Sequence, residues 1–543
     1  MQELIFGFFG GVALLILGID MLGDGLERAA GKAMRKILNT LTSSLWRGIA
    51  VGTLLTAIIQ SSSAMTVMVV GFANAGMMTL EQALGIIYGA NIGTTVSTQL
   101  LRLSITDYAM PIMGVGVAVK MITKNERARN FGHALIGFGM IFLGLTTLGT
   151  GSEVLTSDPA IRQAIQHYAS NPFSAVLIGT VLTGVIQSSF ASTGLVMSLA
   201  NAGVLDFRMS AGITLGNNIG TCVTALLAST GTSRAAKRTA IAHIFFNITG
   251  TLIALVFFDA FTSFIATTSD NLIGQIANLH TIFNISATII FIPITKHFAR
   301  FLYRIVPAET QEAPMGSRHL DKLLLGTPDA ALDATYLELG HAHMTAKRMY
   351  ANVYQANASN DTQYLATITD DEELTNLLQR DITQYLIDLS QQGLSADQAA
   401  QVTDILHSIG DIERIGDHAF AMVEHVEKKI SENLHFSEVA SQQLSEIVDI
   451  VDELSRSVEE TLKNHNDALV DSSKALETTV KALCEQAREG HIDRLERGLC
   501  TIDAGIYYLD ILSHFERIAE HMRHIVLSCS HRRGEMIDDE PGL

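Results

Sequence analysis

The chain contains little charge and few residues that cross-link or break a fold. Of its 543 residues only 17% are Asp, Glu, Lys or Arg, whereas 48% are hydrophobic. Such a composition excludes disordered and nucleic-acid-binding chains. The four cysteines are widely spaced, which excludes a disulfide framework and a CxxC zinc site. P-loop, GxSxG and HExxH motifs are also absent, and we expect neither an enzyme nor an ATP-driven protein.

The charge that is present divides the chain into two unlike parts. Residues 1–310 contain 18 Lys and Arg against 13 Asp and Glu, and residues 311–543 contain 19 against 42. The first part holds apolar runs that are long enough to span a bilayer as helices, which takes roughly 20 residues. These runs lie near residues 4–22, 81–101, 109–122, 131–149, 209–229, 239–258 and 276–298. The sequence therefore predicts a multi-pass membrane domain followed by an acidic domain outside the bilayer.

Three clusters of basic residues predict the orientation of the membrane part. Two clusters lie in short loops between apolar runs, and the third follows the last run. Their members are Lys124, Arg127 and Arg129, then Arg234, Lys237 and Arg238, and finally Lys296, Arg300 and Arg304. By the positive-inside rule all three clusters face the cytoplasm. We therefore expect a multi-pass protein of the plasma (inner) membrane whose C-terminal domain is cytoplasmic.

Two further apolar runs, 48–73 and 174–204, are interrupted by the same polar tripeptide and reveal an internal repeat. Gln60-Ser61-Ser62 returns as Gln187-Ser188-Ser189, and Asn91-Ile92-Gly93-Thr94 returns as Asn218-Ile219-Gly220-Thr221, both at an offset of 127. The number of crossings predicts opposite orientations for the two units. We expect repeat 1 at about 4–122, repeat 2 at about 131–258 and an extra span at 276–298, all within a membrane domain of residues 1–305. Inverted repeats with broken helices are typical of alternating-access transporters.

Each interruption offers hydroxyl and amide groups within an apolar run. The first contributes Gln60, Ser61, Ser62, Ser63 and Thr66, and the second Gln187, Ser188, Ser189, Ser192 and Thr193. A broken helix frees N–H groups, which suit an anion, and carbonyl groups, which suit a hard cation such as Na⁺. Neither run contains a charged residue, so we expect an uncharged site that holds an oxyanion through dipoles, hydroxyls and co-bound cations. The alternative is that these side chains are ordinary polar contacts between membrane helices.

The paired Gln-Ser-Ser motifs, each followed by Gly-x-Asn-Ile-Gly-Thr at 89–94 and 216–221, resemble the type II sodium–phosphate cotransporters over residues 1–305. The resemblance implies transport of inorganic phosphate coupled to Na⁺ by alternating access. It implies phosphate binding by Gln60, Ser61, Ser62, Ser63, Gln187, Ser188 and Ser189. Na⁺ binding is expected at Thr66, Asn91, Thr94, Ser192, Thr193, Asn218 and Thr221. Phe190 stands where the motif has a third Ser, which leaves the ratio of Na⁺ to phosphate open.

The acidic part contains no proline between residues 336 and 530, and its apolar residues recur at three- and four-residue spacing, as in helices. Breaks near 357–361, 391–393, 433–436, 464–471 and 489–491 predict about six helices in a bundle. We expect a linker at 306–335, the helical domain at 336–530 and a tail at 531–543. The complete chain is thus expected to be all-α.

The helical part also contains a repeat. Asp411-Ile-Glu413-Arg-Ile-Gly-Asp417-His418 matches His514-Phe-Glu516-Arg-Ile-Ala-Glu520-His521 at an offset of 103. Each copy places two carboxylates one helical turn apart, which suits either a divalent metal on facing helices or a solvated face with local arginine pairs. This part resembles the PhoU family of phosphate-signalling proteins, which consist of two three-helix bundles. The resemblance implies regulation beside a phosphate permease and metal binding at Glu413, Asp417, Glu516 and Glu520.

The sequence thus predicts a sodium-coupled secondary transporter of inorganic phosphate with a cytoplasmic PhoU-like regulatory domain. Two alternatives stay open, a membrane-anchored phosphate sensor and a phosphate exporter. The inverted repeat disfavours the sensor, because sensing needs no second access route. The direction of net flux and the formation of a homodimer are not determined by the sequence.

Overall fold

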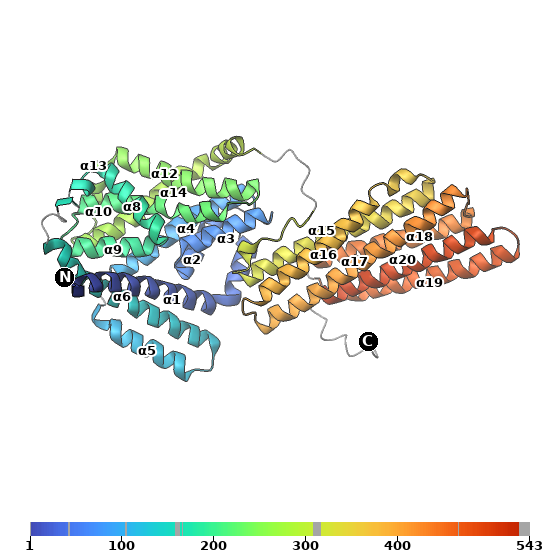
Figure 1. Ribbon diagram of the computed structural model, residues 1–543, viewed down its shortest axis with the longest axis horizontal. Coiled ribbons are helices and arrows are strands. Elements are labelled where there is room, and N and C mark those ends of the chain that lie inside the picture. Colours follow the sequence, from blue (N-terminus) through green and yellow to red (C-terminus); the bar gives the residue numbers. More distant parts are fainter. Residues whose placement is uncertain are drawn as a thin grey trace. The chain divides into compact units, whose positions relative to one another are not determined.

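The computed structural model describes residues 2–41, 44–103, 106–157, 163–164, 167–307, 316–464 and 466–530. Within these residues all regular secondary structure is helical, as Figure 1 shows. The chain divides into two compact units, Met1–Gln311 and Glu312–Leu543. The predicted all-α fold is confirmed.

Unit 1, Met1–Gln311, contains the apolar helices. Among the described residues of this unit, five stretches are long and apolar enough to cross a membrane: Phe6–Leu26, Glu126–Thr150, Phe207–Ala228, Arg234–Val256 and Leu272–Ile305. Two expected spans form helices but are not among these five. Buried Thr, Ser and Asn side chains lie along the helix at 81–101, and the helix at 109–122 has only 14 residues. The helices are α1 (Gln2–Leu41), α2 (Leu45–Ile59), α3 (Ser62–Asn74), α4 (Leu80–Leu101), α5 (Ala109–Ile122), α6 (Glu126–Ser157), α8 (Pro172–Ile186), α9 (Ser189–Asn201), α10 (Phe207–Gly220), α11 (Cys222–Ala228), α12 (Arg234–Val256), α13 (Phe258–Ala266) and α14 (Leu272–Ile305).

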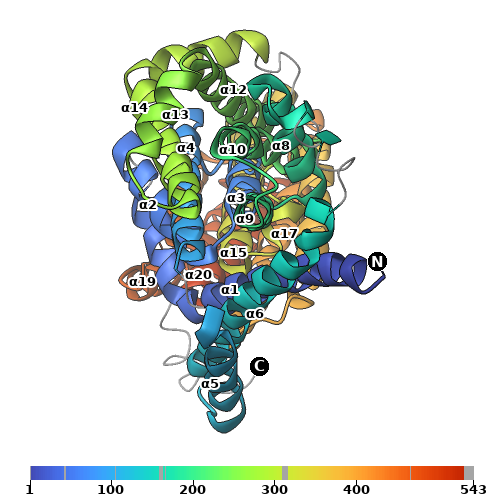
Figure 2. The same cartoon turned by 90° about the vertical axis from the view of Figure 1, so that its left-hand side faces the viewer.

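α1 and α6 are the equivalent first helices of the two repeats, and they lie side by side in Figures 1 and 2. A Cβ at Gly11, Gly18 or Gly25 of α1 would collide with the backbone of α6, at Leu148, Ile141 and Ala134 respectively. Residue numbers rise along α1 as they fall along α6, so the two helices are antiparallel. Because equivalent helices run in opposite directions, the repeats are inverted. Close approach through small residues is a common way to hold membrane helices together.

The repeat also contains a duplicated helix pair. α2 packs on α4, and the equivalent helices α8 and α10 pack in the same way. Thr53 Oγ1 donates to the carbonyl of Gly89 at 3.1 Å, and Thr180 Oγ1 donates to the carbonyl of Gly216 at 3.2 Å. A Cβ at either glycine would collide with a carbonyl oxygen of the facing helix. Both pairs therefore depend on the same glycines for their close packing.

α3 and α9 follow the two interruptions and lie near the centre of unit 1, as Figure 2 shows. The buried core around α9 includes Leu15 of α1, Ile141 of α6 and Ile276 of α14. Irregular backbone at membrane depth is tolerated only where protein buries it or where it lines a cavity. The interior position of α3 and α9 meets that requirement.

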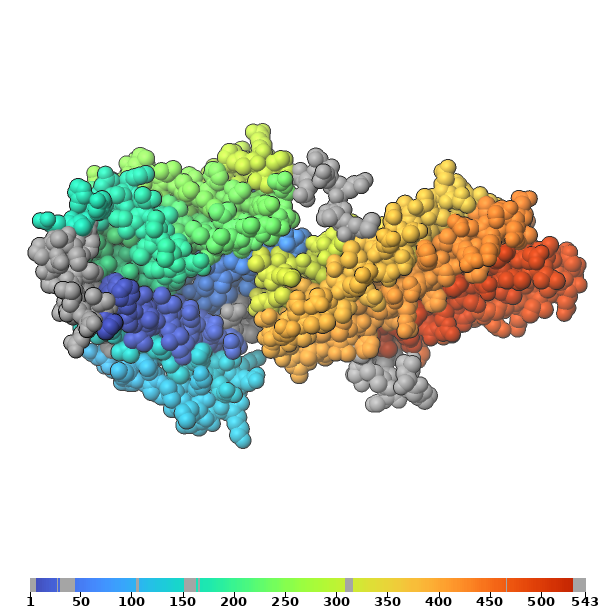
Figure 3. Space-filling view, in the orientation of Figure 1, coloured from blue at the N-terminus to red at the C-terminus, as the bar shows by residue number. Residues whose placement is uncertain are grey.

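Unit 2, Glu312–Leu543, is a bundle of long helices, drawn in yellow to red in Figure 3. They are α15 (Pro328–Ser359), α16 (Ile368–Ser390), α17 (Ala396–Ser431), α18 (Glu438–Asn464), α19 (Leu469–Glu496) and α20 (Ile502–Cys529). α15, α16 and α17 pack on one another, as do α18, α19 and α20, and α17 packs on α20 between the two halves. Six helices in two groups of three agree with the expected bundle.

Two boundaries of the helical part differ from the prediction. The expected linker reached residue 335, but α15 begins at Pro328, since proline is tolerated in the first helical turn. The expected break at 489–491 is wrong, because α19 continues through Gly490 to Glu496. The chain turns instead at Gly498, whose φ of 71° is readily adopted by glycine. The expected tail at 531–543 lies outside the described residues.

The structure brings two of the basic clusters to the same side of unit 1. Arg238, near the start of α12, donates through Nε to the carbonyl of Val306, just after α14, at 2.7 Å. Its guanidinium also lies 4.6 Å from the centre of the Tyr303 ring. A shared side for these clusters is what the positive-inside rule requires.

We expect Gly216→Ala to destabilise unit 1 by about 1–3 kcal/mol, the usual cost of forcing an extra methyl group into a packed interface. The reason is that its Cβ would collide with the carbonyl of Val176. Thermal unfolding in detergent measures the effect. Gly114→Ala is the control, since nothing lies within 4 Å of a Cβ at that position. Equal Tm values for the two variants would contradict the close packing of α8 on α10.

Candidate functional site

The two Gln-Ser-Ser motifs break their helices in the same way. α2 ends at Ile59 and α8 at Ile186, and the next residues, Gln60 and Gln187, have left-handed φ angles of 60° and 58°. The left-handed conformation costs a non-glycine residue about 1–2 kcal/mol. The two copies of the hairpin therefore share the same turn.

Serine residues cap the helices that follow the turns. Ser61 Oγ accepts a hydrogen bond from the N–H of Ala64 at 3.1 Å, and Ser188 Oγ accepts one from the N–H of Ala191 at 3.2 Å. The N–H groups that precede these in the first turn have no partner within the helix. The positive end of the helix dipole lies at the same place. We call the turn at Gln60-Ser61 and the turn at Gln187-Ser188 the two hairpin tips. Each tip presents a helix N-terminus that suits an anion.

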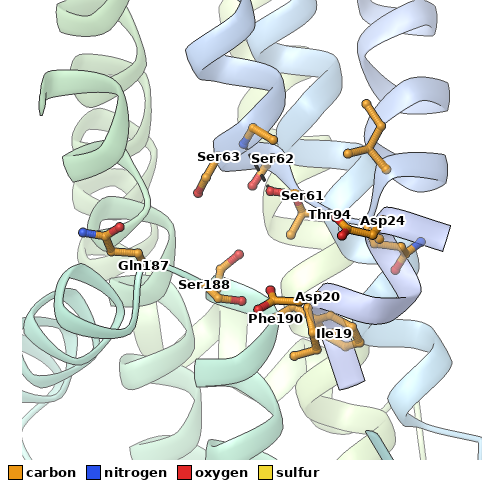
Figure 4. Close-up of a pocket in the computed structure, with 15 residues that line it drawn as sticks. Ile19, Asp20, Asp24, Ser61, Ser62, Ser63, Thr94, Gln187, Ser188 and Phe190 are labelled. Carbon is orange, nitrogen blue, oxygen red and sulfur yellow. Dashed lines mark hydrogen bonds between the residues drawn. The ribbon is translucent and has the colours of Figure 1, made fainter. Parts of the chain in front are cut away.

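The two tips line one pocket, shown in Figure 4, with a volume of about 220 Å³. Ser62 and Ser189 are only 9% and 5% exposed, and their hydroxyls have no hydrogen-bond partner in the described part of the chain. All seven residues expected to bind phosphate contribute to the wall: Gln60, Ser61, Ser62, Ser63, Gln187, Ser188 and Ser189. Residues that are far apart in the sequence are thus gathered around one cavity.

The two sides of the pocket are not equivalent. Gln60 is buried, and its Oε1 accepts a hydrogen bond from Ser97 at 2.5 Å. Gln187 is exposed, and Figure 4 shows its amide away from the serine side chains. Phe190, at the position of Ser63, lines the pocket and joins the apolar core. The first hairpin therefore offers one more hydroxyl, and the second offers an apolar surface.

α1 adds two carboxylates, Asp20 and Asp24, to the wall of the pocket. The expectation of an uncharged site is therefore wrong, because it rested on the two interrupted runs alone. Gly23 lets α1 approach the first tip, since a Cβ there would lie 2.9 Å from the carbonyl oxygen of Ile59. Figure 4 shows Asp20 on the side of Ser188. An ionisable residue inside an apolar run marks a functional site, and that signal at Asp20 is present in the sequence.

Of the seven residues expected to bind Na⁺, Thr94 lines the pocket. The other six are buried but are not part of its wall: Thr66, Asn91, Ser192, Thr193, Asn218 and Thr221. Several make hydrogen bonds within their own helix, as Thr66 Oγ1 does with the carbonyl of Ser62 at 2.7 Å. Ser192 differs, because its buried hydroxyl has no partner among the described residues. Na⁺ binding by these residues stays a prediction.

A buried histidine that the sequence did not point to joins the two repeats. His280 of α14 lies 2.8 Å through Nδ1 from Thr98 Oγ1 of α4, and 3.3 Å through Nε2 from Asn218 Oδ1 of α10. α4 and α10 are equivalent helices, so the ring bridges the repeats close to their Asn-Ile-Gly-Thr motifs. α14 lies outside the repeats, and for that reason no internal match revealed His280.

The four carboxylates expected to bind a divalent metal in unit 2 fit that role unevenly. Burial and the carboxylate of Asp417 raise the pKa of Glu413, and burial raises the pKa of Asp417. A bound cation would relieve that repulsion. Glu516 pairs with Arg488 at 2.5 Å, and Glu520 pairs with a neighbouring arginine at 2.7 Å. Metal binding by these residues stays a prediction, and the first pair suits it better than the second.

Oppositely oriented repeats with broken helices that line one shared polar pocket are typical of membrane transporters. The family model described as "Na+/Pi-cotransporter" matches residues 14–150 and 153–288, which together make up half of the chain. The chain therefore belongs to the Na⁺/Pi-cotransporter family. The PhoU domain model matches residues 339–426 of the helical bundle. Both resemblances seen in the sequence are confirmed.

Known relatives match either most of the chain or about half of it. The uncharacterized protein YqeW of Bacillus subtilis is 30% identical over 306 residues, which are 56% of this chain and 99% of YqeW. YjbB of Escherichia coli, described as a candidate inorganic phosphate export protein, is 24% identical over 522 residues, 93% of this chain and 94% of YjbB. The sodium-dependent phosphate transport protein 2A of Rattus norvegicus is 23% identical over 377 residues, 45% of this chain and 59% of that protein. No solved structure matches this chain.

Proposed function

We propose that this protein is a secondary transporter that carries inorganic phosphate together with Na⁺ through the pocket between the two hairpins. The observation that carries the proposal is that both Gln-Ser-Ser turns, which come from oppositely oriented repeats, line one pocket. Membership of the Na⁺/Pi-cotransporter family supports phosphate as the substrate. The inverted repeats support alternating access to the pocket from the two sides of the membrane.

Phosphate oxygens would accept hydrogen bonds from the N–H groups at the starts of α3 and α9. The hydroxyls of Ser62 and Ser189 would add to these, because they are buried in the pocket wall and lack a protein partner among the described residues. Each hydrogen bond to a charged group contributes about 1.5–3 kcal/mol. The described lining contains no lysine or arginine, so dipoles and hydroxyls would bind the anion.

The carboxylates of Asp20 and Asp24 favour co-bound cations, although Asp24 also lies 3.8 Å from the guanidinium of Arg28. At about 5 Å and an effective dielectric constant of about 20, two like unit charges repel each other by about 3 kcal/mol. A phosphate dianion beside two carboxylates would experience this repulsion several times over. Na⁺ ions at Asp20 and Asp24 would cancel the repulsion, and each ion would then favour binding of the other. This coupling is the physical basis of the proposed cotransport.

Export is the second candidate for the direction of transport. YjbB, which matches 93% of this chain, is described as a candidate phosphate export protein. A dianion that leaves a negative-inside cell moves down the membrane potential, by about 2.3 kcal/mol per charge per 100 mV. Import of the same ion needs about two to three Na⁺ to overcome that potential. The number of Na⁺ ions bound with phosphate would therefore determine the direction.

We also propose that the PhoU-like bundle regulates transport from the cytoplasmic side. YqeW aligns over 99% of its own length with 56% of this chain, so it has no counterpart to the remaining residues. A relative therefore exists that lacks a counterpart to nearly half of this chain. The match of the bundle to the PhoU domain model, separate from the match to the transporter model, supports a regulatory role for the bundle.

Ser62→Ala and Ser189→Ala should each weaken phosphate binding. Loss of a hydrogen bond to a charged ligand, about 1.5–3 kcal/mol, corresponds to a rise of about 10- to 100-fold in the phosphate KM. Flux of ³²P-phosphate in proteoliposomes, inward and outward, with and without a Na⁺ gradient, measures it. Ser198→Ala is the matched control, since Ser198 lies on α9 with a buried, unpartnered hydroxyl but is not part of the pocket wall. A wild-type KM in both pocket variants would refute the assignment, and binding without flux would favour a sensor.

Asp20→Asn should raise the Na⁺ concentration that gives half-maximal flux by about tenfold or more, a change of ~1.4 kcal/mol. The phosphate KM at saturating Na⁺ should stay the same or fall, because the variant repels the anion less. Asp259→Asn is the control, since Asp259 is 82% exposed, pairs with Arg208 at 2.6 Å and lies outside the pocket. An unchanged Na⁺ dependence of Asp20→Asn would exclude this carboxylate as a cation ligand.

A chain that ends at Pro307 should show higher phosphate flux than the full chain when internal phosphate is high, because the regulatory bundle is missing. The measurement compares the two chains in proteoliposomes loaded with increasing phosphate. At low internal phosphate the two should transport at similar rates. The same inhibition by internal phosphate in both chains would show that the bundle does not regulate transport.

A further inference from the structure

The interface between α17 and α20 in unit 2 is rich in histidine. Asp411 and His514 are equivalent positions of the internal repeat, and so are His418 and His521. His521 Nδ1 lies 2.8 Å from Asp411 Oδ1, and His418 Nδ1 lies 3.1 Å from His514 Nδ1. The two contacts are therefore equivalent to each other by the repeat, and they lie along one antiparallel helix pair. One contact joins two imidazoles, and the other joins an imidazole to a carboxylate.

A second histidine, His524, lies close to the carboxylate of Asp411. His524 follows His521 by one helical turn on α20, and its Nδ1 lies 3.8 Å from Asp411 Oδ1. The ligand atoms of Asp411, His521 and His524 all lie within 4.8 Å of one another. In the described part of the chain this is the one group of three His, Cys, Asp or Glu side chains that is so close. None of the four carboxylates expected from the family resemblance belongs to it.

A hydrogen bond between the helices explains only part of this arrangement. One imidazole, His521, is enough to pair with Asp411 at 2.8 Å. The second imidazole, at 3.8 Å, is beyond hydrogen-bond distance, yet its Nδ1 faces the same oxygen. One carboxylate oxygen with two imidazole nitrogens close to it is a ligand set that divalent transition-type ions bind.

The spacing of the three atoms suits a borderline divalent ion. Zn²⁺ binds imidazole nitrogen and carboxylate oxygen at about 2.0–2.2 Å in tetrahedral geometry, which separates ligand atoms by roughly 3.3 Å. The Nδ1 atoms of His521 and His524 lie 2.8 and 3.8 Å from Asp411 Oδ1, one distance on either side of that value. Small side-chain rotations would therefore bring the three atoms to the spacing of a Zn²⁺ site. Two nitrogens and one oxygen favour Zn²⁺ over Mg²⁺ or Ca²⁺, which prefer oxygen ligands. The side chain of His524 is 30% exposed, so the fourth position is open to water.

We propose that Asp411, His521 and His524 form a binding site for one divalent ion of the Zn²⁺ type, held between α17 and α20. α17 belongs to the first three-helix half of the bundle, and α20 belongs to the second. An ion coordinated by both helices links the two halves directly. The site is separate from Glu413, Asp417, Glu516 and Glu520, and its occupancy does not depend on phosphate transport.

The test uses the full chain in detergent after treatment with a chelator. Zn²⁺ binding is measured by calorimetry, and Co²⁺ serves as a spectroscopic probe because tetrahedral nitrogen and oxygen ligands give it strong visible absorption. We expect one ion per chain and a rise in Tm on addition of Zn²⁺. His524→Ala should weaken Zn²⁺ binding at least about tenfold, as even loss of an outer partner does in metal sites, and should abolish the Co²⁺ spectrum. Failure of the wild-type chain to bind Zn²⁺ would overturn the proposal.

Control variants separate this site from the alternatives. Glu413→Gln combined with Asp417→Asn should keep the Zn²⁺ affinity and the Co²⁺ spectrum of the wild type. His435→Ala should do the same, because His435 is an exposed histidine outside the interface. Loss of binding in the Glu413 and Asp417 variant, with binding retained in His524→Ala, would assign the ion to the other carboxylates and overturn the proposal. His524→Gln provides a second variant, and circular dichroism verifies that both variants are folded.

Discussion

The transport unit depends on two short segments that leave the helix in the middle of apolar runs. Backbone groups freed in this way cannot face lipid, so the tips at Gln60 and Gln187 must be covered by protein or must line a cavity. The structure does both, since α3 and α9 lie inside unit 1 and both tips face one pocket. The same constraint supplies the chemistry, because the N–H groups that the broken helices leave unpaired are the groups that an anion needs.

Close packing through glycine decides which side chains reach that pocket. Gly18 and Gly25 hold α1 against α6, and Gly23 brings α1 over the first hairpin tip. Asp20 and Asp24 lie between and beside these glycines on the same helix, and they enter the pocket as a result. An anion site that contains two carboxylates is unfavourable on its own and becomes favourable with cations. The proposed coupling between ions would therefore depend on how α1 packs, and the duplicated hairpins would not supply it alone.

Duplication organises both units, and in each the copies meet at an interface where their side chains differ. In unit 1 the backbone turns are the same, but Ser63 is matched by Phe190, and a buried Gln60 by an exposed Gln187. In unit 2 the repeat produces two equivalent contacts between α17 and α20, but one joins Asp411 to His521 and the other joins His418 to His514. In both units the repeated helices are arranged symmetrically, but the side chains at equivalent positions differ in their chemistry.

The sequence by itself determined the helical class, the inverted repeats, the two polar interruptions and the six-helix bundle, because periodicity and repeated motifs are local signals. It also identified the serines and glutamines that line the pocket. It did not determine that Asp20 and Asp24 join them, that His280 bridges the repeats, or that His524 gathers with Asp411, since each depends on which helix faces which. The continuation of α19 through Gly490 to Glu496, with the turn at Gly498, had the same cause. A helix interior tolerates a glycine when its neighbours are packed, and only the tertiary structure shows that packing.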